Sequence, residues 1–278
     1  PPALARGVMT PTTRGKAQHY EDLDWYEAPR YYDAIYDVDT DPEAAFLEAA
    51  HERHATPGRG RRVLEPACGS GRLLAAMAER GWRGRGVDLG EAMVRYSRER
   101  LRSGGLAGTV VLDNMATFET PGTFDLAHCL VSTFKYLLSE RDARSHLRAV
   151  ARALRPGGIY LLGLHLSRYG TSRKAHERWK VERGGAEVDC TVTTWPPDKT
   201  RRRERVEARM RVVEGGEVRR SRTTWEFRTY DAAQVLRMLR AVTEFEHVET
   251  YDFHYEIEEP QTLSDRQFDT ILVLKRRP

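Results

Sequence analysis

Cysteine is scarce in this 278-residue chain, and long apolar runs are missing. The three cysteines, Cys68, Cys129 and Cys190, match neither metal-ligand spacing nor a disulfide framework, so we expect no metal site and a reducing, cytoplasmic location. No run approaches the ~20 apolar residues that a membrane-spanning helix needs. The first residues also contain no apolar stretch typical of a secretory signal. We therefore expect neither a membrane protein nor a disulfide-stabilised secreted domain.

Positive charge is only slightly in excess, with a formal net charge of +4. Only six of the 45 basic residues are lysine, a bias that indicates a GC-rich bacterial genome. Residues 21–48 carry ten acids against Arg30 alone, and most of the positive excess follows Arg168. Net charge bears on solubility and non-specific attraction rather than on fold. Nucleic acid is therefore an unlikely partner on this count.

The middle of the chain alternates between strand and helix patterns. We predict strands at 61–67, 84–89, 109–113, 123–132 and 159–166, and helices at 70–80, 91–102 and 140–154, with a turn at 156–158. A further helix opens with Asp41 as N-cap and Pro42 at its first position. Such alternation is typical of βαβ units and a parallel sheet with both faces covered.

The pattern changes after Ser167. Residues 178–229 alternate with period two and are broken by Gly184-Gly185 and Gly215-Gly216, which predicts hairpins of a small antiparallel sheet. A helix at 231–241 and strands at 245–255 and 268–276 follow. We therefore predict a flexible tail at 1–18, a core of 19–167 and 230–278, and an insertion of 168–229 that covers the site of the second substrate.

The sharpest motif runs from Glu65 to Gly71, where a strand enters a glycine turn at the start of a helix. Gly69 and Gly71 allow a close approach of ligand to backbone, and the helix start offers unpaired N–H groups. The third glycine of a dinucleotide fingerprint is replaced by Leu74, and Glu65 would repel a pyrophosphate. The acid instead suits a ligand that carries a positive charge. The alternative is a tight turn without a ligand.

Two more acids follow at predicted strand ends. Asp88 suits the two hydroxyls of a ribose, although a cap of the next helix is equally compatible. Asp113, in the step Asp113-Asn114-Met115, suits an exocyclic amine, and the backbone of Met115 suits a base edge. Taken alone, that step is better explained by an Asp-Asn turn.

With these pieces in this order, the chain resembles the class I S-adenosylmethionine-dependent methyltransferases. The match covers about residues 61–165 and includes the Leu154–Gly158 step. It implies an α/β fold: a Rossmann-like, seven-stranded, mostly parallel sheet with helices on both faces and a reversed last strand, plus the antiparallel β insertion after strand five. It also implies S-adenosyl-L-methionine as cofactor, held by Tyr32, Glu65, Ala67, Gly69, Gly71, Asp88, Leu89, Met93, Asp113, Asn114, Met115 and Leu130.

The order of a tyrosine-rich N-terminal helix, core and insertion resembles the small-molecule branch, including sugar-amine and glycine-type N-methyltransferases. Its Tyr-Asp-x-x-Tyr step corresponds to Tyr32–Tyr36, which implies that Tyr36 packs over the cofactor. Aromatic faces also stabilise a sulfonium cation. His165 and His254, at the ends of strands five and six, complete our candidate catalytic set with Tyr36. Ordinary core or boundary residues are the alternative for each of the three.

We expect methyl transfer to a small-molecule acceptor, with nitrogen favoured over oxygen or carbon, and a homodimer through the insertion as one possible assembly. Nucleic-acid amino methyltransferases carry an Asn/Asp-Pro-Pro-aromatic step after strand four, and Leu130–Tyr136 lacks it. The rival functions are an RNA or protein methyltransferase and a non-catalytic partner subunit that binds the cofactor.

Overall fold

The computed structural model describes residues 20–22, 24–37, 40–58, 60–120 and 123–278. Within them, seven strands form the core sheet in the order β11-β12-β6-β5-β2-β3-β4. The predicted tail at 1–18 lies outside the described residues. The strands are β2 (Arg62–Pro66), β3 (Arg83–Asp88), β4 (Gly108–Leu112), β5 (Phe124–Cys129), β6 (Leu154–His165), β11 (Phe245–Tyr251) and β12 (Asp269–Arg276).

All neighbouring pairs in this sheet are parallel except those of β12, which runs antiparallel to both β6 and β11. Apolar side chains of α5 (Glu140–Ala153) and α6 (Ala232–Arg240) pack on one face of the sheet. Those of α2 (Thr40–His54) and α3 (Arg72–Glu79) pack on the other, where α4 (Glu91–Ser103) joins α3. The predicted Rossmann-like architecture is confirmed.

The insertion is a second sheet made of β7 (Ala175–Arg183), β8 (Ala186–Thr194), β9 (Arg203–Glu214) and β10 (Glu217–Arg228). These four strands are antiparallel neighbours, and the short β1 (Glu21–Asp22) adds to β10 in parallel. Both predicted two-residue turns are present, because Gly184-Gly185 and Gly215-Gly216 all have positive φ. That geometry suits the twist of a hairpin.

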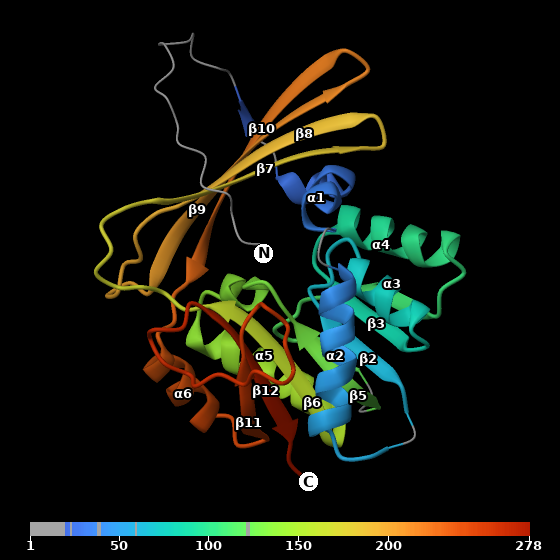
Figure 1. Ribbon diagram of the computed structural model, residues 1–278, viewed down its shortest axis with the longest axis vertical. Helices are drawn as coiled ribbons and strands as arrows, with labels where there is room; N and C mark the ends of the chain where they lie inside the picture. The colour runs from blue at the N-terminus through green and yellow to red at the C-terminus, as the bar shows by residue number, and fades with distance from the viewer. Residues whose placement is uncertain (1–19, 23, 38–39, 59, 121–122) are drawn as a thin grey trace.

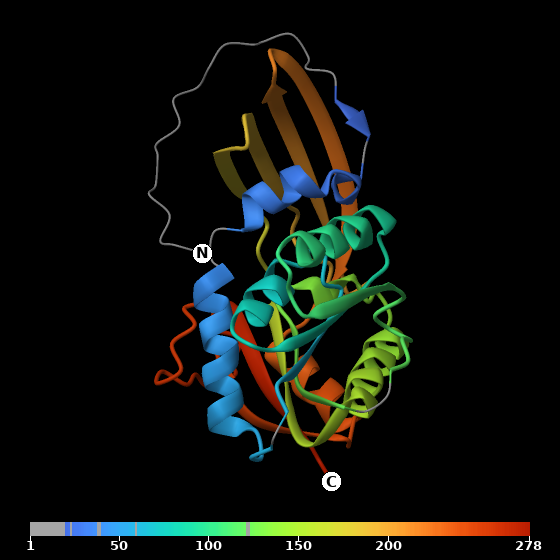
Figure 2. The ribbon, with the colours of Figure 1, turned by 90° about the vertical axis from the view of Figure 1, so that its right-hand side faces the viewer.

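The N-terminal segment lies between the two sheets (Figures 1 and 2). It consists of η1 (Trp25–Glu27) and α1 (Pro29–Tyr36). Trp25 and Ile35 are buried against Val188, Cys190 and Met210 of the insertion. The apolar side chains of this segment therefore share a core with the insertion, although our domain scheme grouped residues 19–36 with the methyltransferase core.

Two local predictions are wrong. The helix expected to have Asp41 as N-cap begins at Thr40, so Asp41 and Pro42 lie in its first turn. The turn expected at 156–158 is part of β6, where Gly157 has φ +77° and the pairing with β5 changes register. An irregularity within a strand and a chain-reversing turn share the same Pro-Gly-Gly signal.

Candidate active site

The glycine turn between β2 and α3 shows why small residues occur there. Ala67, Gly69 and Gly71 have φ values of +57°, +53° and +71°. A Cβ on Gly71 would lie 2.7 Å from Cβ of Ser97, so both backbone angle and packing require glycine. A Cβ on Gly69 would meet no atom within 4 Å. The turn therefore has open space beside Gly69, at the sheet edge where ligands bind in open parallel sheets.

Asp88, the last residue of β3, holds this turn in place. Its Oδ2 accepts from the backbone N–H of Gly69 at 2.7 Å, and its Oδ1 accepts from Gly90 at 2.8 Å. Gly90, not Asp88, is the N-cap of α4, but the Asp88 side chain accepts from the N–H of that residue, so Asp88 also supports the start of the helix, as the alternative expected. Burial raises the pKa of Asp88, and the backbone donors partly offset that shift.

Glu65, near the end of β2, is a buried acid that has a backbone donor, Leu74, but also one unpartnered oxygen. Its Oε2 has no hydrogen-bond partner, and its Oε1 lies 3.9 Å from Nδ1 of buried His128. Burial raises the pKa of Glu65 to about 8, while Arg72 opposes the shift. Burial also lowers the pKa of His128 to about 3, so that ring is neutral. An unpartnered buried carboxyl oxygen favours a cationic ligand, because leaving that oxygen unpaired is unfavourable.

Arg72, the first residue of α3, links the turn to neighbouring elements. It pairs with the buried Glu43 of α2 and donates to Oγ1 of Thr40 at 3.0 Å. Tyr255 donates to the other oxygen of Glu43 at 2.9 Å. Because Glu43 already balances its charge, Arg72 leaves Glu65 open to a further cation.

The residues after β4 form the Asp-Asn turn that was the alternative at this position. Oδ1 of Asp113 accepts from the N–H of Asn114 at 2.7 Å, and Oδ1 of Asn114 accepts from Ala116 at 2.8 Å. The carbonyl of Met115 accepts from His146 at 2.8 Å. Asp113 stands one strand along the sheet from Asp88 and remains half-buried. The turn geometry is therefore compatible with a ligand role but does not require one.

The apolar candidates differ in accessibility. Met93 and Leu130 are 1% and 6% exposed, whereas Leu89 is 71% exposed. Leu130 is the first residue after β5, next to β2 in the sheet. The structure therefore brings Leu130 to the same sheet edge as the acids, while Leu89 projects into solvent.

An aromatic cluster from α1, η1, η2 (Thr133–Tyr136) and β10 lies between the core and the insertion. The hydroxyls of Tyr26 and Tyr136 are hydrogen-bonded to each other. Burial raises the pKa of Tyr26 to about 12, and the nearby charge of Asp88 adds to the shift. Asp88 also acts on Tyr32, whose pKa burial raises well above its usual range. Tyr26 and Tyr32 are therefore the phenols next to the acidic site.

Tyr36 lies further towards the insertion. Its ring centroid is 4.6 Å from that of Tyr32 and 6.2 Å from that of Trp179 on β7. Sequence reasoning missed Trp225, whose ring stacks on those of Trp25 and Tyr136. Trp225 belongs to a charged, alternating strand, so no local signal distinguished it.

The two candidate histidines have different surroundings. His165, half-buried at the end of β6, has Nδ1 at 2.6 Å from Oδ1 of Asp269. His254 is exposed in the turn after β11, where its N–H donates to Asp252. Lys135, which follows β5 in η2 (Thr133–Tyr136), is buried and its Nζ lies 2.5 Å from Oε1 of Glu204 on β9. The charge of Lys135 is therefore already balanced within the protein.

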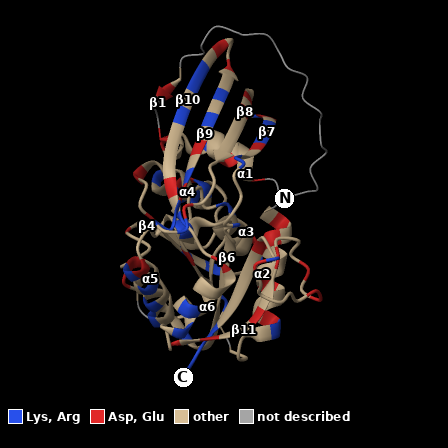
Figure 3. Ribbon diagram, turned by 90° about the vertical axis from the view of Figure 1, so that its left-hand side faces the viewer, with Lys and Arg blue, Asp and Glu red and all other residues tan. Residues whose placement is uncertain are grey.

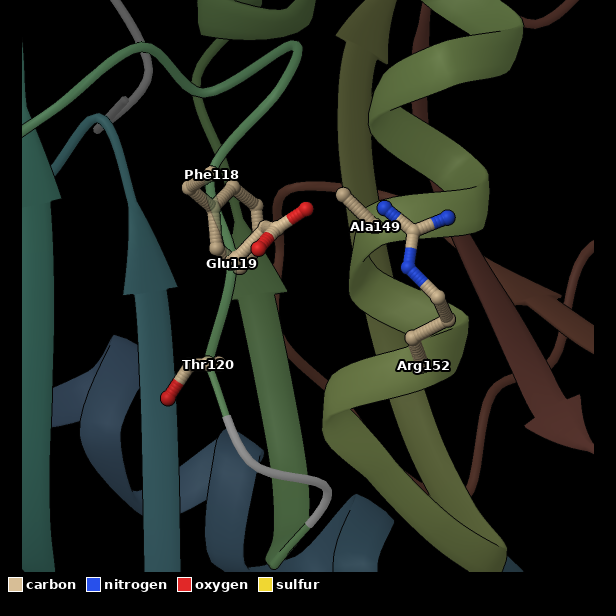
Figure 4. A pocket seen from close by; sticks show the side chains of 5 residues that line it. All are labelled: Phe118, Glu119, Thr120, Ala149 and Arg152. Atoms are coloured by element: carbon tan, nitrogen blue, oxygen red, sulfur yellow. The ribbon is translucent and has the colours of Figure 1, made fainter.

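A second hollow lies elsewhere on the molecule (Figure 4). Phe118, Glu119, Thr120, Ala149 and Arg152 line it, between the segment that leads into β5 and the last turns of α5. This position is at the amino end of β5, away from the carboxyl ends that carry the acids. None of our candidate site residues lines it.

The described ranges hold no cluster of three or more His, Cys, Asp or Glu side chains able to bind a metal ion. Over the same ranges, no helix combines the length and apolar character needed to cross a membrane.

Residues 63–158 match a family described as "Methyltransferase domain", and this range contains the glycine turn and both downstream acids. Residues 63–158 are thus similar to known methyltransferase domains, and the core sheet has the class I methyltransferase fold. A ubiquinone biosynthesis O-methyltransferase of Pseudomonas aeruginosa is 37% identical over 106 residues, which are 37% of this chain and 44% of that protein. The chain thus spans less than half the length of this curated relative.

Solved structures match over nearly the whole chain. An S-adenosylmethionine-dependent methyltransferase from Clostridium acetobutylicum has a TM-score of 0.72 at 18% identity and covers 91% of this chain and 99% of its own. The sugar N-methyltransferase KedS8 from Streptoalloteichus has a TM-score of 0.68 at 23% identity and covers 98% and 100%. At these identities the likeness concerns the fold, insertion included.

Proposed function

We propose that this protein is an enzyme that transfers a methyl group from S-adenosyl-L-methionine to a small-molecule acceptor. The observation that carries the proposal is the buried Glu65 carboxyl group, which has an unpartnered oxygen beside an open glycine turn. An ammonium group of the donor would supply the missing partner, as the chemistry of a buried acid requires. Asp88 would hold the ribose hydroxyls, and Asp113 with Met115 the adenine.

The bound donor would supply a methyl group on a sulfonium sulfur. The chain would hold that cation beneath Tyr26 and Tyr32, because electron-rich aromatic faces stabilise positive charge. The insertion would cover the acceptor, and its closed aromatic interface would exclude water. Tyr36 and His165 are the catalytic residues that we propose on the acceptor side. His254, exposed beyond β11, is the weaker third candidate.

Nitrogen is the acceptor atom that we favour. The O-methyltransferase relative matches only about the length of the core that would hold the donor. The sugar N-methyltransferase matches in fold through the insertion as well, which is the part that would contact the acceptor. A sugar amine or a comparable amine is therefore the acceptor class to test first.

A nucleic-acid substrate is disfavoured by the charge arrangement of the insertion. Basic and acidic residues are interleaved along β9 and β10 (Figure 3). Arg211 pairs with Glu187 at 3.1 Å, and Arg178 pairs with Asp189. Arginines paired within the sheet make a poor phosphate track. Binding to RNA that weakens steeply with salt would favour this rival instead.

The test is incubation of the protein with donor labelled in its methyl group and a cell extract, followed by identification of the metabolite that gains label. Labelled amine supports the proposal, whereas labelled RNA or protein supports the first rival. Donor binding without transfer to any acceptor would indicate a non-catalytic partner subunit. A homodimer through the insertion and a cytoplasmic location, the latter favoured by three buried free cysteines, belong to the same proposal.

A further inference from the structure

The ring of His165 is fixed by β12 and the segments around it. The antiparallel register places Asp269 directly opposite His165, and Oδ1 of Asp269 lies 2.6 Å from Nδ1. Phe268 stacks on the imidazole with centroids 4.8 Å apart and planes at 14°, and Phe253 lies at 5.1 Å. The orientation of the imidazole is therefore set before any ligand binds.

The backbone of His165 is held as well. Its N–H donates to Oγ of Ser132 at 2.9 Å, and its carbonyl accepts from Nζ of Lys135 at 3.2 Å. Val131 and Ser132 have φ values of +53° and +65°, which L residues rarely adopt. Such conformations persist where surrounding contacts enforce them, and they concentrate at functional sites.

The second polar atom of the His165 side chain is Nε2. Among the residues that the structure describes, none forms a hydrogen bond with Nε2 of His165, and the side chain is 30% exposed. A carboxylate that accepts from Nδ1–H leaves the lone pair of a neutral imidazole on Nε2. His165 is the last residue of β6. This strand is two strands, or about 10 Å, away from β2, which carries Glu65.

We propose that His165 is the general base towards the acceptor and that Asp269 is its positioning residue. The inference rests on the proposed function. The N–H or O–H proton of the acceptor passes to Nε2 and then to solvent. The lone pair of the acceptor forms the bond to the methyl carbon, and the electrons of the broken carbon–sulfur bond remain on the sulfur of the donor. Asp269 stabilises the imidazolium that forms.

Further charged or titratable groups near the His165–Asp269 pair are Lys135, Arg168 and His254. Lys135 reaches the backbone of His165 but is paired with Glu204, and Arg168 lies over Phe268 at 5.0 Å. Burial raises the pKa of Asp269, but hydrogen bonding to His165 outweighs it and lowers this pKa, and His254 lowers it slightly further. Asp269 is the acid in hydrogen-bond contact with the ring, so its removal is the specific perturbation.

The first test needs no acceptor. Nitrogen-15 NMR of histidine-labelled protein, with the His165 signals assigned from His165→Gln, reports tautomer and titration. We expect the Nδ1–H tautomer in the wild-type protein and a weaker preference for it in Asp269→Asn. Asp252→Asn, which removes a nearby carboxylate bonded to His254, is the control and should leave His165 unchanged. An Nε2–H tautomer in the wild-type protein would overturn the inference even if a variant failed to fold.

The second test uses the acceptor found by methyl labelling. We expect His165→Gln and Asp269→Asn to lower kcat at least tenfold with unchanged donor affinity, and Asp269→Glu to recover part of the loss. The pH profile of kcat should also change in Asp269→Asn, because the carboxylate that stabilises the imidazolium is removed. If His165→Gln had the kcat and the pH profile of the wild-type protein, the inference would be overturned. The proposed methyl transfer would still stand. If the wild-type protein labels nothing, the proposed function fails, and the inference, which rests on it, falls with it.

Discussion

At the residue scale, Glu65 illustrates how burial prepares a side chain for a ligand. The carboxyl group is 8% exposed and has an oxygen without a partner. Its pKa near 8 means that the ligand-free protein carries it largely protonated at neutral pH. A bound ammonium group would lower this pKa, because an opposite charge favours the ionised form. Proton release is thus coupled to donor binding.

We therefore expect donor affinity to rise with pH up to about 8 and then to level off, because the proton leaves Glu65 on binding. Glu65→Gln should weaken binding by about 1.5–3 kcal/mol, the range of a charged hydrogen bond, and should remove this pH dependence. Titration calorimetry in two buffers of different ionisation enthalpy measures both effects. If Glu65→Gln released as many protons on donor binding as the wild-type protein, the protons would come from a group other than Glu65.

The same residue affects folding in the absence of a ligand. The folded-state pKa of about 8 lies above the ordinary value of 4.5, so the folded protein binds this proton more tightly than the unfolded chain. The free energy of unfolding should have its full contribution from Glu65 below pH 4.5 and lose it as pH rises through 8. Glu65→Gln should flatten that part of the curve in urea unfolding experiments. If the unfolding free energy of the variant changed with pH as that of the wild-type protein does, the assignment of this pKa to Glu65 would be contradicted.

At the element scale, the β2–α3 turn and Asp88 act as one unit. Asp88 connects the glycine turn with the start of α4 through two backbone donors. Each parallel strand of this group ends at the same edge, so a turn, an acid and an Asp-Asn step that are distant in sequence become neighbours. The sheet, rather than any single motif, assembles the candidate site.

The two glycines of this turn should respond differently to alanine. Gly71→Ala combines a left-handed backbone, at about 1–2 kcal/mol, with an overlap against Ser97 that typically adds about 1–3 kcal/mol. Gly69→Ala has only the first cost, so it is the matched control for stability, measured by chemical unfolding. Its new methyl group projects into open space and should weaken donor binding instead. Equal destabilisation by both would show that the contact with Ser97 relaxes freely.

At the scale of the whole molecule, several contacts fix the insertion to the core. The insertion leaves and rejoins the core where the N–H of Ser167 donates to the carbonyl of Tyr230 at 2.7 Å. The buried Lys135–Glu204 pair and the Arg228–Glu140 pair at 2.8 Å connect the insertion sheet to η2 and α5 of the core. Trp225 of β10 also stacks on Tyr136 of η2 within the aromatic cluster. These contacts therefore hold the insertion against the core.

Glu204→Gln should destabilise the protein by about 3–5 kcal/mol, because it leaves the Lys135 ammonium buried without a counter-charge. Asp189→Asn is the control: its partner Arg178 is 67% exposed, so the loss should stay below about 1 kcal/mol. Thermal and urea unfolding measure the difference. A small effect of Glu204→Gln would mean that water or another acid reaches Lys135.

Local patterns in the sequence predicted the alternation of strands and helices, the hairpin turns of the insertion and the glycine turn with its downstream acids. These features are local: periodicity, turn residues and strand ends are written in neighbouring residues. The predictions for Asp41 and for the Pro156–Gly158 step were wrong, because the same residues occur in more than one local geometry.

Contacts between groups that are distant in the chain became known from the folded structure alone. No spacing predicts that Asp269 pairs with His165 across 104 residues or that Glu204 neutralises Lys135 across 69. The tertiary structure likewise placed Trp25 and Ile35 in the core of the insertion. Such contacts depend on sheet order, strand register and desolvation, which act between segments that the chain keeps far apart until it folds.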